Sequence, residues 1–170
     1  MSKHRRKFTL FLKILLHLPL LLLAYILQDM IFPRLQIAGT VPLVLPLAAV
    51  AVAMFEGSIR GGLFGLASGI LCDASLGRPA VLFTITLTAC ALLVGILGET
   101  VLARGFPSYL VCAACTLLVC CVLQALPLLI YAGAAFSALA ATGLMQILYS
   151  MLLCLPVYWM ARSLNRLAGA

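Results

Sequence analysis

The sequence predicts an all-α integral membrane protein, a bundle of about six transmembrane helices. Of the 170 residues, 65% are hydrophobic and 9% are charged, whereas a soluble domain has about 45–50% apolar and about 25% charged residues. The apolar residues form six runs of about 20 residues, the length that crosses about 30 Å of hydrocarbon. A water-soluble protein of this size has too little interior to hide so much apolar surface, so we expect lipid to be its solvent.

Short connections separate the six apolar runs, so consecutive helices should be antiparallel neighbours. The predicted spans are about residues 10–32, 37–55, 58–76, 79–98, 107–131 and 137–159. They form one transmembrane domain, 10–161, between a basic N-terminal tail, 1–9, and a short C-terminal tail, 162–170.

The first three spans each carry a distinctive feature. The first follows a basic tail, as in a signal peptide, but its apolar run exceeds the 7–15 residues of a signal-peptide core, which indicates an uncleaved span. The second contains Pro42 and Pro46. Those prolines would break a soluble helix, but in a bundle neighbouring helices can satisfy the carbonyls that proline frees. The third is the least hydrophobic and the richest in glycine.

The last three spans are more regular. Residues 84–88 of the fourth alternate briefly like a strand, but a β-barrel needs many alternating segments. The fifth contains Gln124 and Pro127. The sixth ends with Tyr158 and Trp159, which match an aromatic belt at a membrane surface.

The basic residues predict the orientation. With six spans and a cytoplasmic N-terminus, nine of the eleven Lys and Arg residues lie inside, and Arg34 and Arg78 lie outside. The inside set is Lys3, Arg5, Arg6, Lys7, Lys13, Arg60, Arg104, Arg162 and Arg166. Without the third span the split would be seven to four, so the positive-inside rule favours six spans with both termini in the cytoplasm. This distribution explains the net charge of +7 without a nucleic-acid partner.

The seven cysteines do not predict a disulfide framework or a metal centre. They are odd in number and lie in or beside apolar runs, where cysteine serves as a small, soft hydrophobe. Cys112 and Cys115 have redox or zinc spacing, but a single pair without histidine is a weak signal. We expect no metal and no cofactor.

The most informative pattern is a row of glycines in the third span. Gly57, Gly61, Gly65 and Gly69 recur every four residues, and Asp73 takes the next place. Residues four apart share one helix face, and a bare glycine face lets another backbone approach closely in a membrane. We therefore expect these five residues to form a helix-packing or partner interface.

Asp73 needs a further explanation, because a carboxylate in a span costs about 2.5–3.5 kcal/mol at mid-bilayer. The open alternatives are an ion pair with Arg78, a cap on a neighbouring helix, a polar contact in the bundle, or contact with a ligand or partner. A second expected ion pair joins Glu56 and Arg60, which are four residues apart.

The sequence predicts no enzyme. His4 and His17 have no carboxylate or cysteine nearby in the sequence, and no zinc-protease, nucleophile-elbow or phosphate-loop motif occurs. A channel would need paired acids or a polar stripe along a pore, which the four acidic residues do not supply.

In length, span layout and the glycine-rich stretch at 56–78, the chain resembles the rod shape-determining protein MreD family of bacteria. That family has a glycine-spaced third helix ending in a Gly-Leu-Leu-x-Asp-like element and then a glycine. Here the element is Gly69-Ile70-Leu71-Cys72-Asp73, followed by Leu76-Gly77-Arg78.

The resemblance implies a non-enzymatic, multi-pass subunit of the cell-wall elongation complex in the bacterial cytoplasmic membrane. Its implied partners are MreC first, then the actin-like MreB, RodA and a class B penicillin-binding protein. The family is similar in fold to the substrate-binding membrane subunits of energy-coupling-factor transporters, so a vitamin-uptake subunit is the alternative. That alternative requires a pocket with several polar groups reached from outside.

Overall fold

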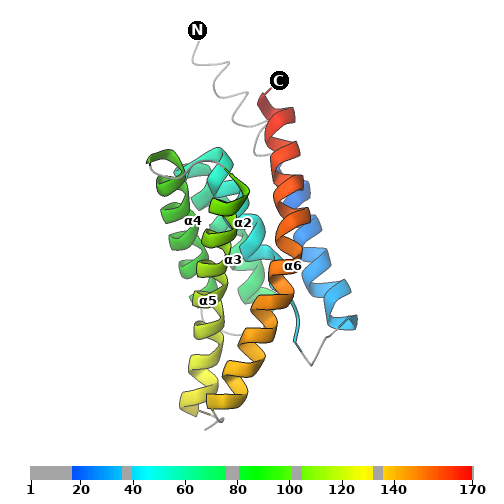
Figure 1. Ribbon diagram of the computed structural model, residues 1–170, viewed down its shortest axis with the longest axis vertical. Coiled ribbons are helices and arrows are strands. Elements are labelled where there is room, and N and C mark those ends of the chain that lie inside the picture. Colours follow the sequence, from blue (N-terminus) through cyan, green and yellow to red (C-terminus); the bar gives the residue numbers. More distant parts are fainter. Residues whose placement is uncertain (1–16, 36–39, 76–80, 101–104, 132–135, 170) are drawn as a thin grey trace.

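The computed structural model describes residues 17–35, 40–75, 81–100, 105–131 and 136–169, which form six helical segments and no sheet (Figure 1). The first segment is helical over 17–26 and continues as a π-helix, η1 (Leu27–Ile31), and a 3-10 helix, η2 (Phe32–Arg34). The others are α2 (Val44–Glu56), α3 (Ser58–Ser75), α4 (Leu82–Thr100), α5 (Phe106–Tyr131) and α6 (Phe136–Gly169). The all-helical prediction is confirmed for these residues.

Three of the described helices are long and apolar enough to cross a membrane: Leu82–Thr100, Phe106–Ile130 and Phe136–Arg166. They indicate a multi-pass membrane protein. Helix α2 is apolar but has only 13 residues, about 20 Å at 1.5 Å per residue. Six complete spans therefore remain a prediction.

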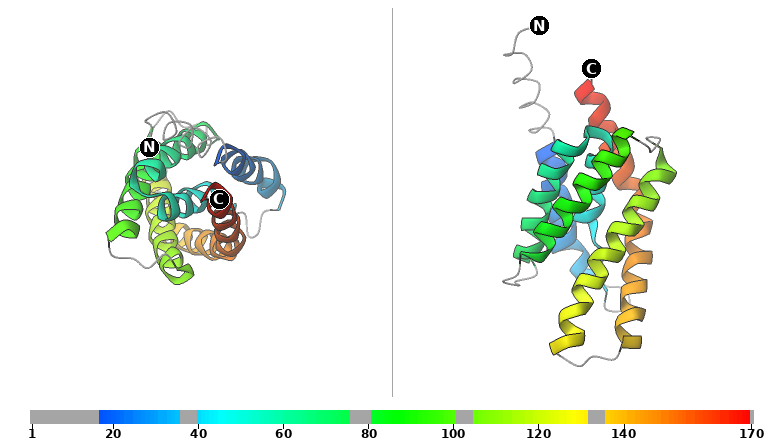
Figure 2. Two further views of the ribbon diagram at one scale, coloured as in Figure 1. Left: turned by 90° about the horizontal axis from the view of Figure 1, so that it is seen from above. Right: turned by 90° about the vertical axis from the view of Figure 1, so that its left-hand side faces the viewer.

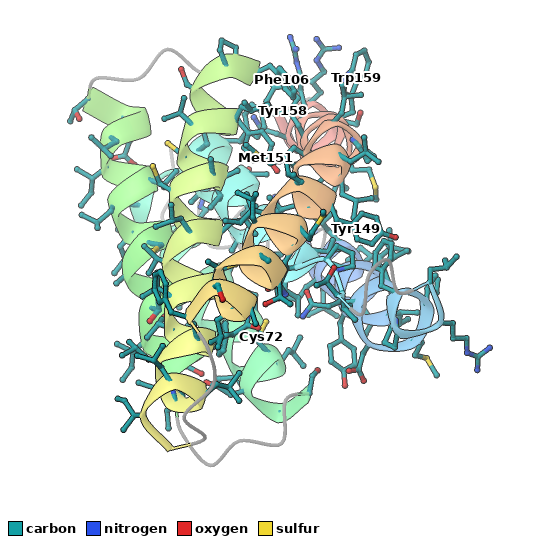
Figure 3. All side chains as sticks on the ribbon, turned by 60° about the horizontal axis from the view of Figure 1, so that its bottom comes forward. Cys72, Phe106, Tyr149, Met151, Tyr158 and Trp159 are labelled. Atoms are coloured by element: carbon teal, nitrogen blue, oxygen red, sulfur yellow. The ribbon has the colours of Figure 1, made fainter. Side chains whose placement is uncertain are left out.

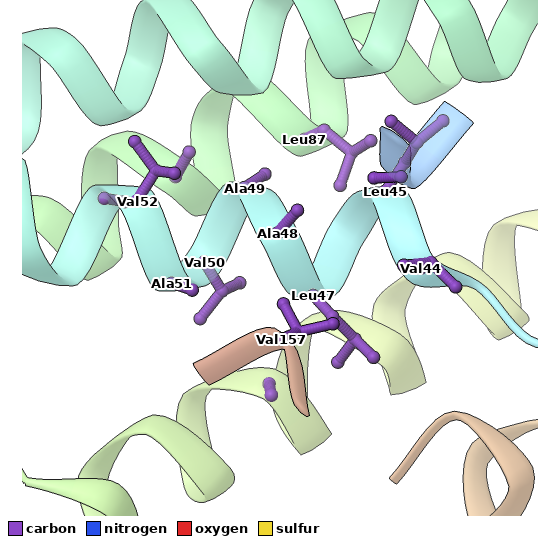
Figure 4. Packing of buried hydrophobic residues seen from close by; sticks show 14 of the residues in the cluster. Val44, Leu45, Leu47, Ala48, Ala49, Val50, Ala51, Val52, Leu87 and Val157 are labelled. Carbon is purple, nitrogen blue, oxygen red and sulfur yellow. The ribbon is translucent and has the colours of Figure 1, made fainter. Parts of the chain in front are cut away.

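Helix α2 is the centre of the bundle. It contacts α3, α4, α5 and α6 (Figure 2), and every residue from Val44 to Met54 is buried. Leu87 of α4 and Val157 of α6 pack against it from different sides (Figure 4). The surrounding helices instead expose apolar residues on their outer faces, as expected where lipid is the solvent.

The second predicted span is shorter than expected, because α2 begins at Val44 and not near residue 37. Residues 41–43 precede it without helical structure. Pro46 therefore lies in the first turn, where a backbone N–H has no partner inside the helix. Pro46 thus removes no helical hydrogen bond, and the expected support from neighbouring helices goes to the backbone before α2, where Gln146 of α6 donates to the Val41 carbonyl.

Consecutive helices run antiparallel, as predicted from the short connections (Figures 1 and 2). We call one end of the bundle the Gly57 end, because the α2–α3 turn at Gly57 lies there together with the C-terminal part of α6. The opposite end, where α3 ends and α4 begins, is the Asp73 end. Helices α5 and α6 extend past α3 and α4 at the Asp73 end (Figure 2).

Candidate functional site

The glycines of α3 lie against helices of the same chain. A Cβ added to Gly61 would overlap Ala53 of α2, and one added to Gly69 would overlap the Thr84 backbone of α4. At Gly65 an added Cβ would lie 2.7 Å from the Leu87 carbonyl oxygen of α4. Bare backbone at these positions allows α3 to pack closely on both α2 and α4. The face is therefore occupied within this chain and offers no open groove to a partner's helix.

Gly57 differs from the other three glycines because it precedes α3. Its φ angle is +89°, a conformation that glycine adopts freely and other residues rarely do. Its N–H donates to the Ala53 carbonyl at 3.0 Å, which ends α2 and reverses the chain into α3. The regular spacing thus combines one turn residue with three packing residues.

Two glycines of α4 complete the same contact and were missed in the sequence. An added Cβ at Gly95 would overlap the Ser58 backbone, and one at Gly98 would lie 3.4 Å from the Met54 carbonyl oxygen. The two are three residues apart and so share one helix face, and this spacing in the fourth span was the available signal.

Asp73 caps the N-terminus of α4. Its Oδ1 accepts a hydrogen bond from the Phe83 N–H at 3.2 Å, and its Oδ2 accepts from the Thr84 N–H at 2.9 Å. The Thr84 hydroxyl also donates to Oδ2 at 2.6 Å. A carboxylate at a helix N-terminus is favoured by the orphan N–H groups and the helix dipole. The structure thus shows the capping alternative, while Arg78, the other expected partner, lies outside the described residues.

The N-terminus of α3 is capped in the same manner, at the Gly57 end. The Ser58 N–H donates to Oε1 of Glu99, near the end of α4, at 3.0 Å. Beside it, Arg60 forms the expected ion pair with Glu56. Asp73 and Glu99 therefore link α3 to α4 by hydrogen bonds, one at each end of the helix pair.

A third cap lies at the N-terminus of α2. Oε1 of Gln28, in η1, accepts from the N–H groups of Val44 and Leu45, both at 2.9 Å. Its Nε2 lies 3.6 Å from Sγ of Cys72 on α3. A π-helical turn, the local structure of η1, often marks a functional position.

Helix α6 supports the non-helical backbone just before α2. The Ser150 hydroxyl accepts from the Leu43 N–H at 3.0 Å, and Gln146 Nε2 donates to the Val41 carbonyl at 2.9 Å. Inside a bilayer no water satisfies such groups, so protein side chains must do so. The sequence did not reveal these partners, because Leu43 and Ser150 are 107 residues apart and Val41 and Gln146 are 105 residues apart.

Aromatic side chains join α2, α5 and α6 at the Gly57 end. The rings of Phe55, Phe106, Tyr109 and Tyr158 form a buried or half-buried cluster, with Tyr158 5.3 Å from both Phe106 and Tyr109 between ring centroids. Tyr158 faces this cluster, whereas its neighbour Trp159 points away from it (Figure 3). The Tyr109 hydroxyl also donates to the Leu47 carbonyl at 3.2 Å.

Two of the cavities lined by described residues border the first helix. One, of about 250 Å³, lies between the first helix, α2 and α3. Its lining is His17, Leu18, Leu21, Val52, Glu56, Arg60, Leu63, Phe64 and Ala67. The other, of about 460 Å³, lies between the first helix and the C-terminal part of α6 and includes Trp159 and Ser163.

The described residues contain no group of three or more His, Cys, Asp or Glu side chains placed to hold a metal ion. All seven cysteines are free thiols. The site residues thus build and cap helices, and the described polar groups converge mainly on backbone atoms. The chain matches no protein-family model, and neither a curated protein nor a solved structure is significantly similar to it.

Proposed function

We propose that this protein is a non-enzymatic integral membrane subunit of the bacterial cell-wall elongation complex, and that it helps determine cell shape by binding other members of the complex. The observation that carries the proposal is the use of the described part of the glycine-rich stretch, residues 56–75. Its most distinctive residue, Asp73, caps α4, so the stretch serves architecture. A scaffold subunit of this kind resembles the MreD family.

The proposed orientation places the Gly57 end and both termini in the cytoplasm of a bacterial cytoplasmic membrane. MreC is the first expected partner, followed by MreB, RodA and a class B penicillin-binding protein. Because the glycine face is covered by α2 and α4, the contact with MreC belongs on another surface.

We assign that contact to the outer face of α6. Exposed leucines follow one another on this helix at intervals of three or four residues, and so share one face. They are Leu144, Leu148, Leu152 and Leu155. Such a stripe can pack against the single membrane helix of a partner through van der Waals contact.

A vitamin-uptake subunit is less well supported. Under the proposed orientation, the outer half of the bundle uses Gln28, Gln146 and Ser150 to satisfy the backbone around α2. The cavity that contains His17, Glu56 and Arg60 lies at the opposite, cytoplasmic end. A substrate that arrives from outside would not reach those groups.

Depletion of the protein in its rod-shaped host, followed by microscopy, tests the proposal. We expect rounded cells, rescue by the wild-type chain, and copurification of MreC with it from detergent. Replacing Leu148 and Leu152 with alanine should weaken that copurification, whereas Ile85→Ala, at an exposed position on α4, should not. Normal cell shape together with lost vitamin uptake would refute the proposal and favour the transporter.

A further inference from the structure

The cavity between the first helix, α2 and α3 is polar at one end and apolar below it. On α3, Arg60 lies near the Gly57 end, and Ala67 lies about 10 Å deeper, seven residues along the helix. On α2 the lining residue one turn deeper than Glu56 is Val52. The first helix follows the same order, because His17 precedes Leu21. Three separate helices thus place polar groups at one level and apolar groups beneath.

The polar end of the cavity presents positive charge outward. In the Arg60–Glu56 ion pair, the arginine side chain is 34% exposed, whereas the carboxylate side chain is 2% exposed. The guanidinium is therefore the accessible partner. The exposed guanidinium can therefore accept an anion from the membrane surface.

The apolar part of the cavity suits a hydrocarbon chain better than water. A buried water needs two to four polar partners, and an apolar cavity of about 150 Å³ stays dry and takes up benzene. The present cavity is larger, about 250 Å³, and its deeper wall consists of Leu21, Val52, Leu63, Phe64 and Ala67. The adjoining helices expose apolar residues to the lipid phase, which is the nearest source of such a chain.

We propose that this cavity binds one anionic phospholipid from the leaflet at the Gly57 end, with an acyl chain between the first helix and α3. The lipid phosphate then lies at the Arg60 guanidinium, which binds phosphate oxygens through several N–H donors. The bound lipid fills the space between the first helix and the α2–α3 pair. This inference does not depend on the proposed function.

Native mass spectrometry of the full-length protein in detergent micelles tests the inference. Phosphatidylglycerol or phosphatidylcholine with identical acyl chains is added, and the retained lipids are counted. We expect one retained phosphatidylglycerol and weaker retention of phosphatidylcholine. Equal retention of the two lipids would refute the assignment of the headgroup to Arg60.

Variants that fill the cavity distinguish lipid binding at this site from general lipid contact on the protein surface. Ala67→Phe places a ring in the acyl-chain space and should lower phosphatidylglycerol affinity about tenfold. Ala74→Phe makes the same change two turns later at an exposed position of α3, and should retain the lipid as the wild type does. Equal retention by wild type and Ala67→Phe, or equal loss in both variants, would refute the inference.

A second pair of variants fills the cavity from its opposite wall. Leu21→Trp enters the cavity, whereas Leu22→Trp changes an exposed neighbour outside the lining. Only Leu21→Trp should lose the lipid, with helix content by circular dichroism unchanged in both. A dimer of the wild type that Leu21→Trp dissociates would assign the cavity to a second copy of the chain and overturn the lipid proposal.

Discussion

Replacing Asp73 with leucine should destabilise the protein by about 2–4 kcal/mol, because it leaves the start of α4 uncapped inside the bundle. The side chain accepts three hydrogen bonds, from the Phe83 N–H, the Thr84 N–H and the Thr84 hydroxyl, at 2.6–3.2 Å. Loss of an N-cap costs about 0.5–2 kcal/mol. Leaving a buried N–H unsatisfied adds about 1–3 kcal/mol, and Thr84 is buried.

The measurement is the free energy of unfolding in mixed detergent and dodecyl sulfate micelles, followed by circular dichroism. Asp73→Asn keeps one acceptor oxygen and should lose about half as much stability as Asp73→Leu. Asp29→Leu is the matched control, because Asp29 is exposed and its carboxylate accepts one long hydrogen bond, from Tyr25 at 3.4 Å.

The control should change stability by less than about 0.5 kcal/mol, as surface substitutions usually do. If Asp73→Leu unfolds with the same free energy as Asp29→Leu, the cap does not hold α4 in place. The architectural use of the glycine-rich stretch would then be refuted as well, since it depends on the same contact.

Two further predictions concern the packing and the central helix. Gly65→Ala should lower the free energy of unfolding by about 1–3 kcal/mol, because its Cβ would lie 2.7 Å from the α4 backbone. At Gly143 the nearest neighbour of an added Cβ is 3.9 Å away. Gly143→Ala should therefore be neutral or stabilise α6 by up to about 1 kcal/mol. Gln28→Leu should cost about 2–4 kcal/mol by uncapping α2. Gln124→Leu should leave the free energy of unfolding unchanged, because Nε2 of Gln124 is buried without a hydrogen-bond partner among the described residues. The same micelle unfolding assay measures all four, and equal losses within either pair would contradict the reasoning.

Several features of the fold followed from local pattern. The helical class and the antiparallel order came from apolar runs of similar length with short connections, and the Glu56–Arg60 pair came from a spacing of four. The glycine spacing correctly identified a close-packed face at Gly61, Gly65 and Gly69. Each of these properties follows from a spacing within one helix or from the run lengths of consecutive segments.

The residue at which α2 begins could not be predicted from local sequence pattern. The run from residue 37 to 55 is mostly apolar, and its two prolines, Pro42 and Pro46, did not by themselves fix where the helix begins. The boundary depends on Gln28, Gln146 and Ser150, which satisfy the backbone there. Helix ends in a membrane are set by available partners for the orphan backbone groups, and those partners are distant in the chain.

By itself, the sequence predicted a lipid environment and a helical fold, since the composition and the length of the apolar runs suffice for both. Only the tertiary structure decided which group caps which helix: Asp73 acts across 11 residues, Gln28 across 16 and Glu99 across 41. It also decided that the glycine face is filled by the chain's own helices. The physical reason is that caps and close packing depend on distances in space, which a one-dimensional pattern does not contain.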